Sequence, residues 1–241
     1  MDRPGASPDL RLLWQGLALF TAYALFRHAM VDRYSVTATA DVVRYEWILA
    51  AANGLLALAL LGLGARGLGW RRLWNGPGRP WLALVLGVGV VLSCGYSWSD
   101  RVMAPMTPDF NGLRVAALGL GLGMALAEEI GFHGLVFGAV ERLKGQAWAI
   151  GISATLFTLL HVDQRLCAAS PRTALGGLAL SLARARGLGV GELVVIHFAA
   201  EAAWALFLPL DPGLDGAREL VSAAVNGLVC VALWRMKKPA L

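Results

Sequence analysis

Two adjacent glutamates and a histidine interrupt an otherwise apolar stretch in the middle of the 241-residue chain. The run reads Ala-Leu-Ala-Glu128-Glu129-Ile-Gly-Phe-His133-Gly, and the flanking stretches 115–124 and 135–140 carry no charge. An ionisable side chain inside a bilayer costs about 2.5–3.5 kcal/mol on insertion scales. Such residues therefore indicate a functional site, and their spacing of four places Glu129 and His133 on one helix face.

Two further apolar stretches carry histidines. One reads Phe157-Thr-Leu-Leu-His161, and the other, His197-Phe-Ala-Ala-Glu201, again pairs His with Glu four residues apart. A lone membrane histidine often only bonds a neighbouring helix, and an isolated Phe is usually packing. Separate burial of so many polar groups would incur the desolvation cost repeatedly. We therefore expect one shared wet cavity that gathers Glu128, Glu129, His133, His161, His197 and Glu201.

Carboxylates and imidazoles in an apolar wall suit hydrolysis by an activated water. A glutamate can act as a general base near neutral pH, and an imidazole can orient the water or contact an oxyanion. Ser153 and Thr158 are candidate nucleophiles by proximity alone, so a covalent route is the less favoured one. His161, His197 and a glutamate could also form a His₂Glu zinc set, which leaves a metal open from the spacing.

Composition indicates the elements that must hold these residues. The chain is 57% hydrophobic and 15% charged, whereas soluble proteins are about 25% charged. We predict an all-α polytopic membrane protein in which residues 1–241 form a single integral-membrane domain, because no internal repeat or linker is present. A span needs about 20 apolar residues, which predicts about eight transmembrane helices: Leu10–Arg27, Tyr45–Ala65, Trp81–Trp98, Leu113–Val140, Ala147–His161, Thr173–Ala183, Val190–Leu210 and Leu220–Trp234.

Basic residues predict the orientation. Arg and Lys crowd the ends of the second, fourth, sixth and eighth predicted spans, whereas the loops at the other ends hold arginines offset by acids. By the positive-inside rule the basic ends are cytoplasmic, so both termini lie inside, the loop at 66–79 is internal and that at 100–111 external. Counting 1.5 Å per residue from the basic ends places the polar site in the outer half of the membrane.

In order and spacing, the three polar runs resemble the CPBP (Abi) family of glutamic-type intramembrane proteases, relatives of the CAAX prenyl endopeptidases. That family carries a double Glu followed by an Arg, then Phe-x-x-x-His, then His-x-x-x-Asn, each on its own helix. The resemblance covers a protease-like core at 113–210. A Gly-Phe-His-Gly form of the first motif resembles a bacterial, myxosortase-like branch linked to C-terminal sorting signals.

The resemblance implies an intramembrane endopeptidase of the bacterial inner (plasma) membrane that cuts a membrane-anchored protein. It implies catalysis without a metal and no binding of nucleic acid. It implies that Glu128 activates water with His161, that His197 contacts the oxyanion, and that the supporting residues are Glu129, His133, Glu201, Phe132 and Phe157. Two residues depart from the family pattern: His133 replaces Arg and Glu201 replaces Asn. We expect both to face the same cavity and to alter which substrate it accepts.

Other classes of function use the same residues. A non-enzymatic immunity or scaffold protein would keep this fold without needing Glu128. A proton-coupled transporter would use intramembrane Glu and His as a relay. A haem protein would use His161 and His197 as axial ligands. Loss of proteolysis on substitution of Glu128 discriminates the protease from these alternatives.

Overall fold

The computed structural model describes residues 7–33, 39–74, 81–84, 86–88, 112–161, 170–207 and 216–237. Every regular element among these residues is helical. The helices are α1 (Pro8–Arg33), α2 (Thr39–Leu68), α3 (Trp70–Trp74), α5 (Gly112–Glu128), η1 (Glu129–Val136), α6 (Phe137–Lys144), α7 (Gln146–Leu160), α8 (Pro171–Ala185), α9 (Val190–Phe207) and α10 (Gly216–Arg235), with short helical stretches at 81–84 and 86–88.

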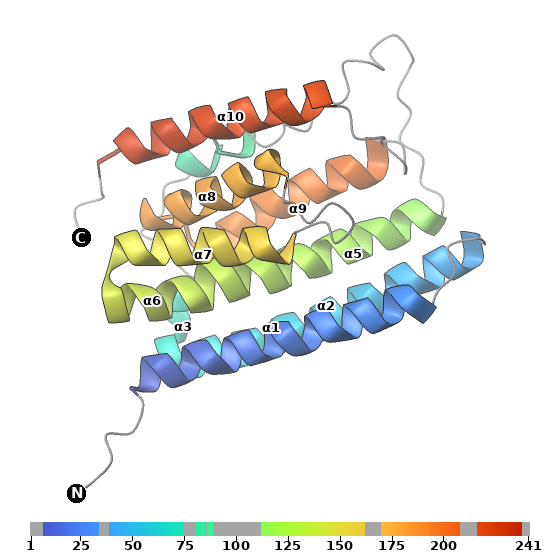
Figure 1. Ribbon diagram of the computed structural model, residues 1–241, viewed down its shortest axis with the longest axis horizontal. Helices are drawn as coiled ribbons and strands as arrows, with labels where there is room; N and C mark the ends of the chain where they lie inside the picture. Colours follow the sequence, from blue (N-terminus) through green and yellow to red (C-terminus); the bar gives the residue numbers. More distant parts are fainter. Residues whose placement is uncertain are drawn as a thin grey trace, which may run out of the picture.

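A long central rod made of α5, η1 and α6 organises the bundle. It packs against α1 and α2 on one side and against α7 and α9 on the other, and α8 lies between α7 and α10 (Figure 1). Small residues allow the closest approaches. A Cβ on Gly123 would lie 3.0 Å from the Ala50 carbonyl oxygen of α2, and a Cβ on Gly121 would lie 2.7 Å from Cβ of Glu201 on α9. The rod is thus packed closely between α2 on one side and α9, which carries His197 and Glu201, on the other.

The middle of the rod is a π-helix, which the sequence analysis did not predict. The π segment η1 starts at Glu129, immediately after the α-helical Glu128, and runs to Val136. A π-helix has hydrogen bonds between residues i and i+5, is rare, and frequently occurs at functional sites. The hydroxyl of Ser153 on α7 donates a 2.7 Å hydrogen bond to the Phe132 carbonyl oxygen. This side-chain bond satisfies a buried carbonyl of the distorted stretch, which helps to stabilise it.

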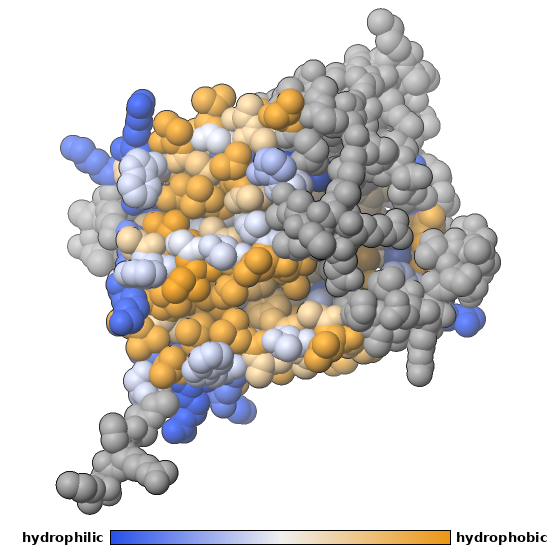
Figure 2. All heavy atoms as spheres, viewed as in Figure 1, coloured by the Kyte–Doolittle hydropathy of each residue, from blue (hydrophilic) through white to orange (hydrophobic). Residues whose placement is uncertain are grey.

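The outer surface of the bundle is apolar, as a membrane protein requires. Figure 2 shows a broad hydrophobic band, with hydrophilic side chains along the edge where α6 meets α7. Large apolar residues of several helices lie exposed, among them Leu55 and Leu58 of α2, Val195 of α9 and Leu228 of α10. Contiguous exposed apolar surface of this kind is unfavourable in water. The prediction of an all-α membrane protein is therefore confirmed.

Two described segments are long and apolar enough to cross a membrane: Val42–Leu68, of 27 residues, and Gly112–Lys144, of 33 residues. By contrast, α7 and α8 have 15 residues each, about 22 Å of helix against a hydrocarbon core of about 30 Å. Most of the predicted span Trp81–Trp98 lies outside the described residues. The count of eight spans therefore stays a prediction.

Arginines tie the helix ends together at the edge where α6 meets α7. Arg142 contacts Asp9 of α1 and donates to the Gly67 carbonyl oxygen of α2 at 3.1 Å. Arg186, after α8, donates at 2.8 Å to the carbonyl oxygens of Leu233 and Trp234. The last carbonyls of a helix lack intrahelical partners, and these guanidinium groups satisfy some of them. The first turn of α1 and the last turn of α10 therefore lie at one basic end of the bundle.

Candidate active site

The two adjacent glutamates, which lie on either side of the α-to-π junction, contact different partners. Glu129 is fully buried, and its two carboxylate oxygens each lie 2.8 Å from an imidazole Nδ1, one of His133 and one of His197. The contact to His197 is a hydrogen bond between helices, whereas His133 lies four residues on in the same helix. An ionised carboxylate only accepts, so His197 donates from Nδ1 and keeps Nε2 for other partners.

Glu128 faces two imidazoles from two other helices. Its Oε2 lies 3.5 Å from Nε2 of His161 and 4.0 Å from Nε2 of His197. His161 places Nδ1 2.8 Å from the Phe157 carbonyl oxygen, which can only accept, so this nitrogen carries a hydrogen. Nε2 of His161 therefore remains for Glu128, and Nε2 of His197 lies between Glu128 and Glu201. The buried Oε2 of Glu128 has no hydrogen-bond partner within the described residues. The separations leave a place where a small molecule could bridge the three groups.

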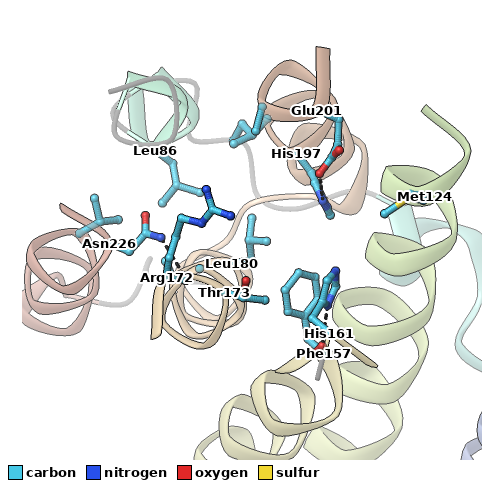
Figure 3. Close-up of a pocket in the computed structure, with 15 residues that line it drawn as sticks. Leu86, Met124, Phe157, His161, Arg172, Thr173, Leu180, His197, Glu201 and Asn226 are labelled. Carbon is cyan, nitrogen blue, oxygen red and sulfur yellow. Dashed lines mark hydrogen bonds and ion pairs between the residues drawn. The ribbon is translucent and has the colours of Figure 1, made fainter. Parts of the chain in front are cut away.

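A cavity of about 330 Å³ opens beside these groups. His161, which directly follows α7, and His197 of α9 project toward each other across it, and Glu201 lies next to His197 (Figure 3). The Glu201 carboxylate is 3.7 Å from Nε2 of His197, and its side chain is 33% exposed. The sequence expectation that one cavity gathers all six polar residues holds for His161, His197 and Glu201, which line it, and is wrong for Glu128, Glu129 and His133, which do not. His133 is completely buried and lies against Glu129 instead.

Aromatic rings hold the histidines in place. The Phe157 ring lines the cavity, and its centroid lies 4.6 Å from that of His161, 5.7 Å from that of His133 and 6.0 Å from that of His197. Phe132 lies behind it, stacked on Phe20 of α1 at 4.4 Å. Phe157 therefore shapes the cavity wall, whereas Phe132 packs the π segment against the first layer.

Three polar residues of the cavity were missed by sequence reasoning. Arg172 and Thr173 come from the first turn of α8, and Asn226 comes from α10 and donates to the Arg172 carbonyl oxygen at 3.0 Å. The sequence did hold a signal for Arg172. Arg184 and Arg186 lie near the C-terminal end of α8, at the basic edge, whereas Arg172 lies at the opposite end of the same helix, away from that edge. Asn226 gave none, because a single buried amide in an apolar helix is common as a structural group.

The predicted hydroxyl candidates are engaged elsewhere. Ser153 donates to the Phe132 carbonyl oxygen and Thr158 to the Ala154 carbonyl oxygen at 2.8 Å. Across the described ranges, no group of three or more His, Cys, Asp or Glu side chains is arranged so that it could hold a metal ion. Catalysis without a metal nevertheless stays a prediction.

Together, the fold and the site define a helical membrane protein with a buried glutamate–histidine centre assembled from three helices. The family model described as type II CAAX prenyl endopeptidase Rce1-like matches residues 110–203. This match confirms the resemblance to the CPBP family over the segment that carries all six predicted polar residues. The match does not distinguish the myxosortase-like branch, which stays a prediction. No curated protein and no solved structure matches the chain.

Proposed function

We propose that this protein is an intramembrane endopeptidase in which Glu128 activates a water that hydrolyses a peptide bond of a membrane-associated protein. One observation carries the proposal: a buried carboxylate faces the Nε2 atoms of His161 and His197, whose other ring nitrogens are already engaged. Such a set is preorganised for one small molecule, and the matching family is one of peptidases.

The roles follow from this geometry. Glu128 takes a proton from the water while His161 orients it. The oxygen of the attacked carbonyl becomes negative and is placed near Nε2 of His197. Glu129 acts on His197 through the 2.8 Å bond to Nδ1, which orients the ring and keeps a hydrogen on Nδ1. His133 contacts the other carboxylate oxygen of Glu129. It therefore helps to position the carboxylate that in turn positions His197.

The position of the site favours a cut near one membrane surface. His161 follows the last residue of α7, whose first residue lies at the basic end. If the basic end is cytoplasmic, the site is in the outer half of a bacterial inner membrane and both termini are inside. A site at this depth suits the removal of a C-terminal sorting signal next to an apolar anchor, as in the myxosortase-like branch.

The proposal is tested in two stages. Membrane proteins that stay uncut in cells carrying Glu128→Gln identify the substrate. Purified wild-type protein in lipid nanodiscs should then cleave that substrate, and the Glu128→Gln protein should not. Wild-type protein that leaves the substrate intact would favour the non-enzymatic or transporter alternatives.

The orientation predicts a labelling pattern for the central rod. Lys144 and Gly112 lie exposed at the opposite ends of one continuous helical segment. In a background without the three native cysteines, an impermeant thiol reagent added outside intact cells should label Gly112→Cys and miss Lys144→Cys until the membrane is opened. The opposite pattern would place the basic end outside and the site in the inner half of the membrane.

Catalysis without a metal predicts insensitivity to chelation. Purified protein treated with a strong chelator should keep its rate of cleavage, and it should contain well below one zinc per chain by elemental analysis. Zinc in a one-to-one ratio, with activity lost on its removal and regained on its return, would instead support a His₂Glu centre.

A further inference from the structure

The imidazole of His197 is surrounded by three carboxylates, and only one of them lines the cavity. Nδ1 is bonded to Glu129, whereas Nε2 lies between Glu128 at 4.0 Å and Glu201 at 3.7 Å. The side chains of Glu128 and Glu129 are 5% and 0% exposed, but that of Glu201 is 33% exposed and lines the cavity. A substrate in the cavity would therefore meet Glu201 directly.

Local packing fixes Glu201 in this position. It lies one helical turn after His197 on α9, and Gly121 of α5 leaves room for its Cβ, since any side chain there would come within 2.7 Å. Arg172 lines the same cavity (Figure 3). Glu201 thus lies between the imidazole of His197, which can exchange protons, and the cavity in which the substrate would bind.

Peptide hydrolysis needs a proton at a second place. An activated water attacks the carbonyl carbon, but the C–N bond breaks readily only if the departing nitrogen receives a proton. Glu128 is buried and has just received the proton of the water. An asparagine at position 201, as in the family pattern, could hydrogen-bond but could not deliver a proton.

We propose that His197 and Glu201 together hold one proton and deliver it from the cavity side to the departing amine. This role rests on the proposed peptidase function and adds a residue to it. The proton belongs to the pair, because two interacting groups at this distance titrate together. Glu201 is the member that the departing nitrogen reaches first.

In the first step the water oxygen bonds to the carbonyl carbon, the C=O π pair moves to oxygen, and one water proton goes to Glu128. In the second step the oxyanion pair re-forms the C=O bond, the C–N bond breaks with its electron pair going to nitrogen, and nitrogen takes the proton of the His197–Glu201 pair. The products are a carboxylic acid and an amine. The proton on Glu128 returns to the pair through Nε2 of His197, which lies between both carboxylates.

The test compares two leaving groups. An amine leaves with a proton, whereas nitrophenolate leaves without one. The substrates are a peptide that covers the identified cleavage site and a nitrophenyl ester of the same acyl segment, both presented to wild type and variants in nanodiscs. We expect Glu201→Gln to lower peptide cleavage by about 10²-fold or more and to leave ester hydrolysis nearly unchanged. Glu201→Asp should regain part of the peptide activity.

Controls separate this role from others. Glu192→Gln removes a carboxylate from the same helix outside this cavity and should leave both activities unchanged. Equal losses on peptide and ester in Glu201→Gln would overturn the proposal and assign Glu201 to structure or charge balance. Unchanged peptide cleavage would also overturn it. In contrast, Glu128→Gln should lower both activities. Full activity of the Glu128→Gln variant would refute the proposed peptidase mechanism itself. Wild-type protein that cleaves neither substrate would refute it as well.

Discussion

Glu128→Gln is expected to lower peptide cleavage by about 10²–10⁴-fold, the usual contribution of a general base. Glutamine keeps the shape of the side chain but cannot accept the proton of the attacking water. Because Oε2 of Glu128 has no hydrogen-bond partner within the described part of the chain, the substitution removes no bond seen there. The measurement is cleavage of the identified substrate in nanodiscs, together with the melting temperature, which should stay close to that of wild type.

The matched control is Glu141→Gln. Glu141 lies on the same continuous rod but is exposed at the basic end, so its substitution should leave the cleavage rate unchanged. A Glu128→Gln protein that folds, inserts and cleaves at the wild-type rate would contradict an activated-water mechanism based on this residue.

Glu129→Leu is expected to abolish cleavage and also to destabilise the fold. The Glu129 carboxylate lies 2.8 Å from the Nδ1 atoms of His133 and His197, so the substitution leaves both nitrogens without this acceptor. Leaving a buried polar group without its partner costs about 1–3 kcal/mol. His197 also loses the bond that directs Nε2 toward Glu128. Thermal unfolding in detergent, measured beside the cleavage assay, should show both losses.

Glu129→Gln gives the graded comparison. Its amide oxygen can still accept a hydrogen bond from one imidazole, but this bond lacks the negative charge of a carboxylate. We therefore expect a smaller loss of stability than in Glu129→Leu and a strong loss of activity. The contrast with Glu128→Gln is the informative result, since one glutamate is expected to act on water and the other to position His197. A Glu129→Leu protein with wild-type melting temperature would contradict this positioning role.

Sequence periodicity predicted those features that depend on neighbours along the chain. Apolar runs located most helices, and the spacing of four predicted the contact between Glu129 and His133. It could not show that His197 bonds Glu129 rather than Glu128, because that depends on how α9 lies against the rod. Arg172 and Asn226 enter the cavity from helices far along the chain, so no local pattern linked them to the glutamates.

The π-helix was missed for a related reason. Nothing in its residue types distinguishes a π-helix from an α-helix, and one of its stabilising contacts comes from Ser153 on a different helix. An uninterrupted α-helix was therefore the natural prediction for 113–140. The difference concerns His133 directly, since it lies in the π segment, where it is buried against Glu129 and does not line the cavity.

The π segment also makes the length of the central rod part of the site. Residues after η1 are rotated about the axis relative to an uninterrupted α-helix, because each π turn holds extra backbone. Deleting one residue within 129–136 would let the stretch relax to an α-helix, and either the glutamates or the basic turn of α6 would then face the wrong neighbours. In proteins related to this chain, the number of residues between the two glutamates and the basic turn should therefore vary less than the identity of the residues between them.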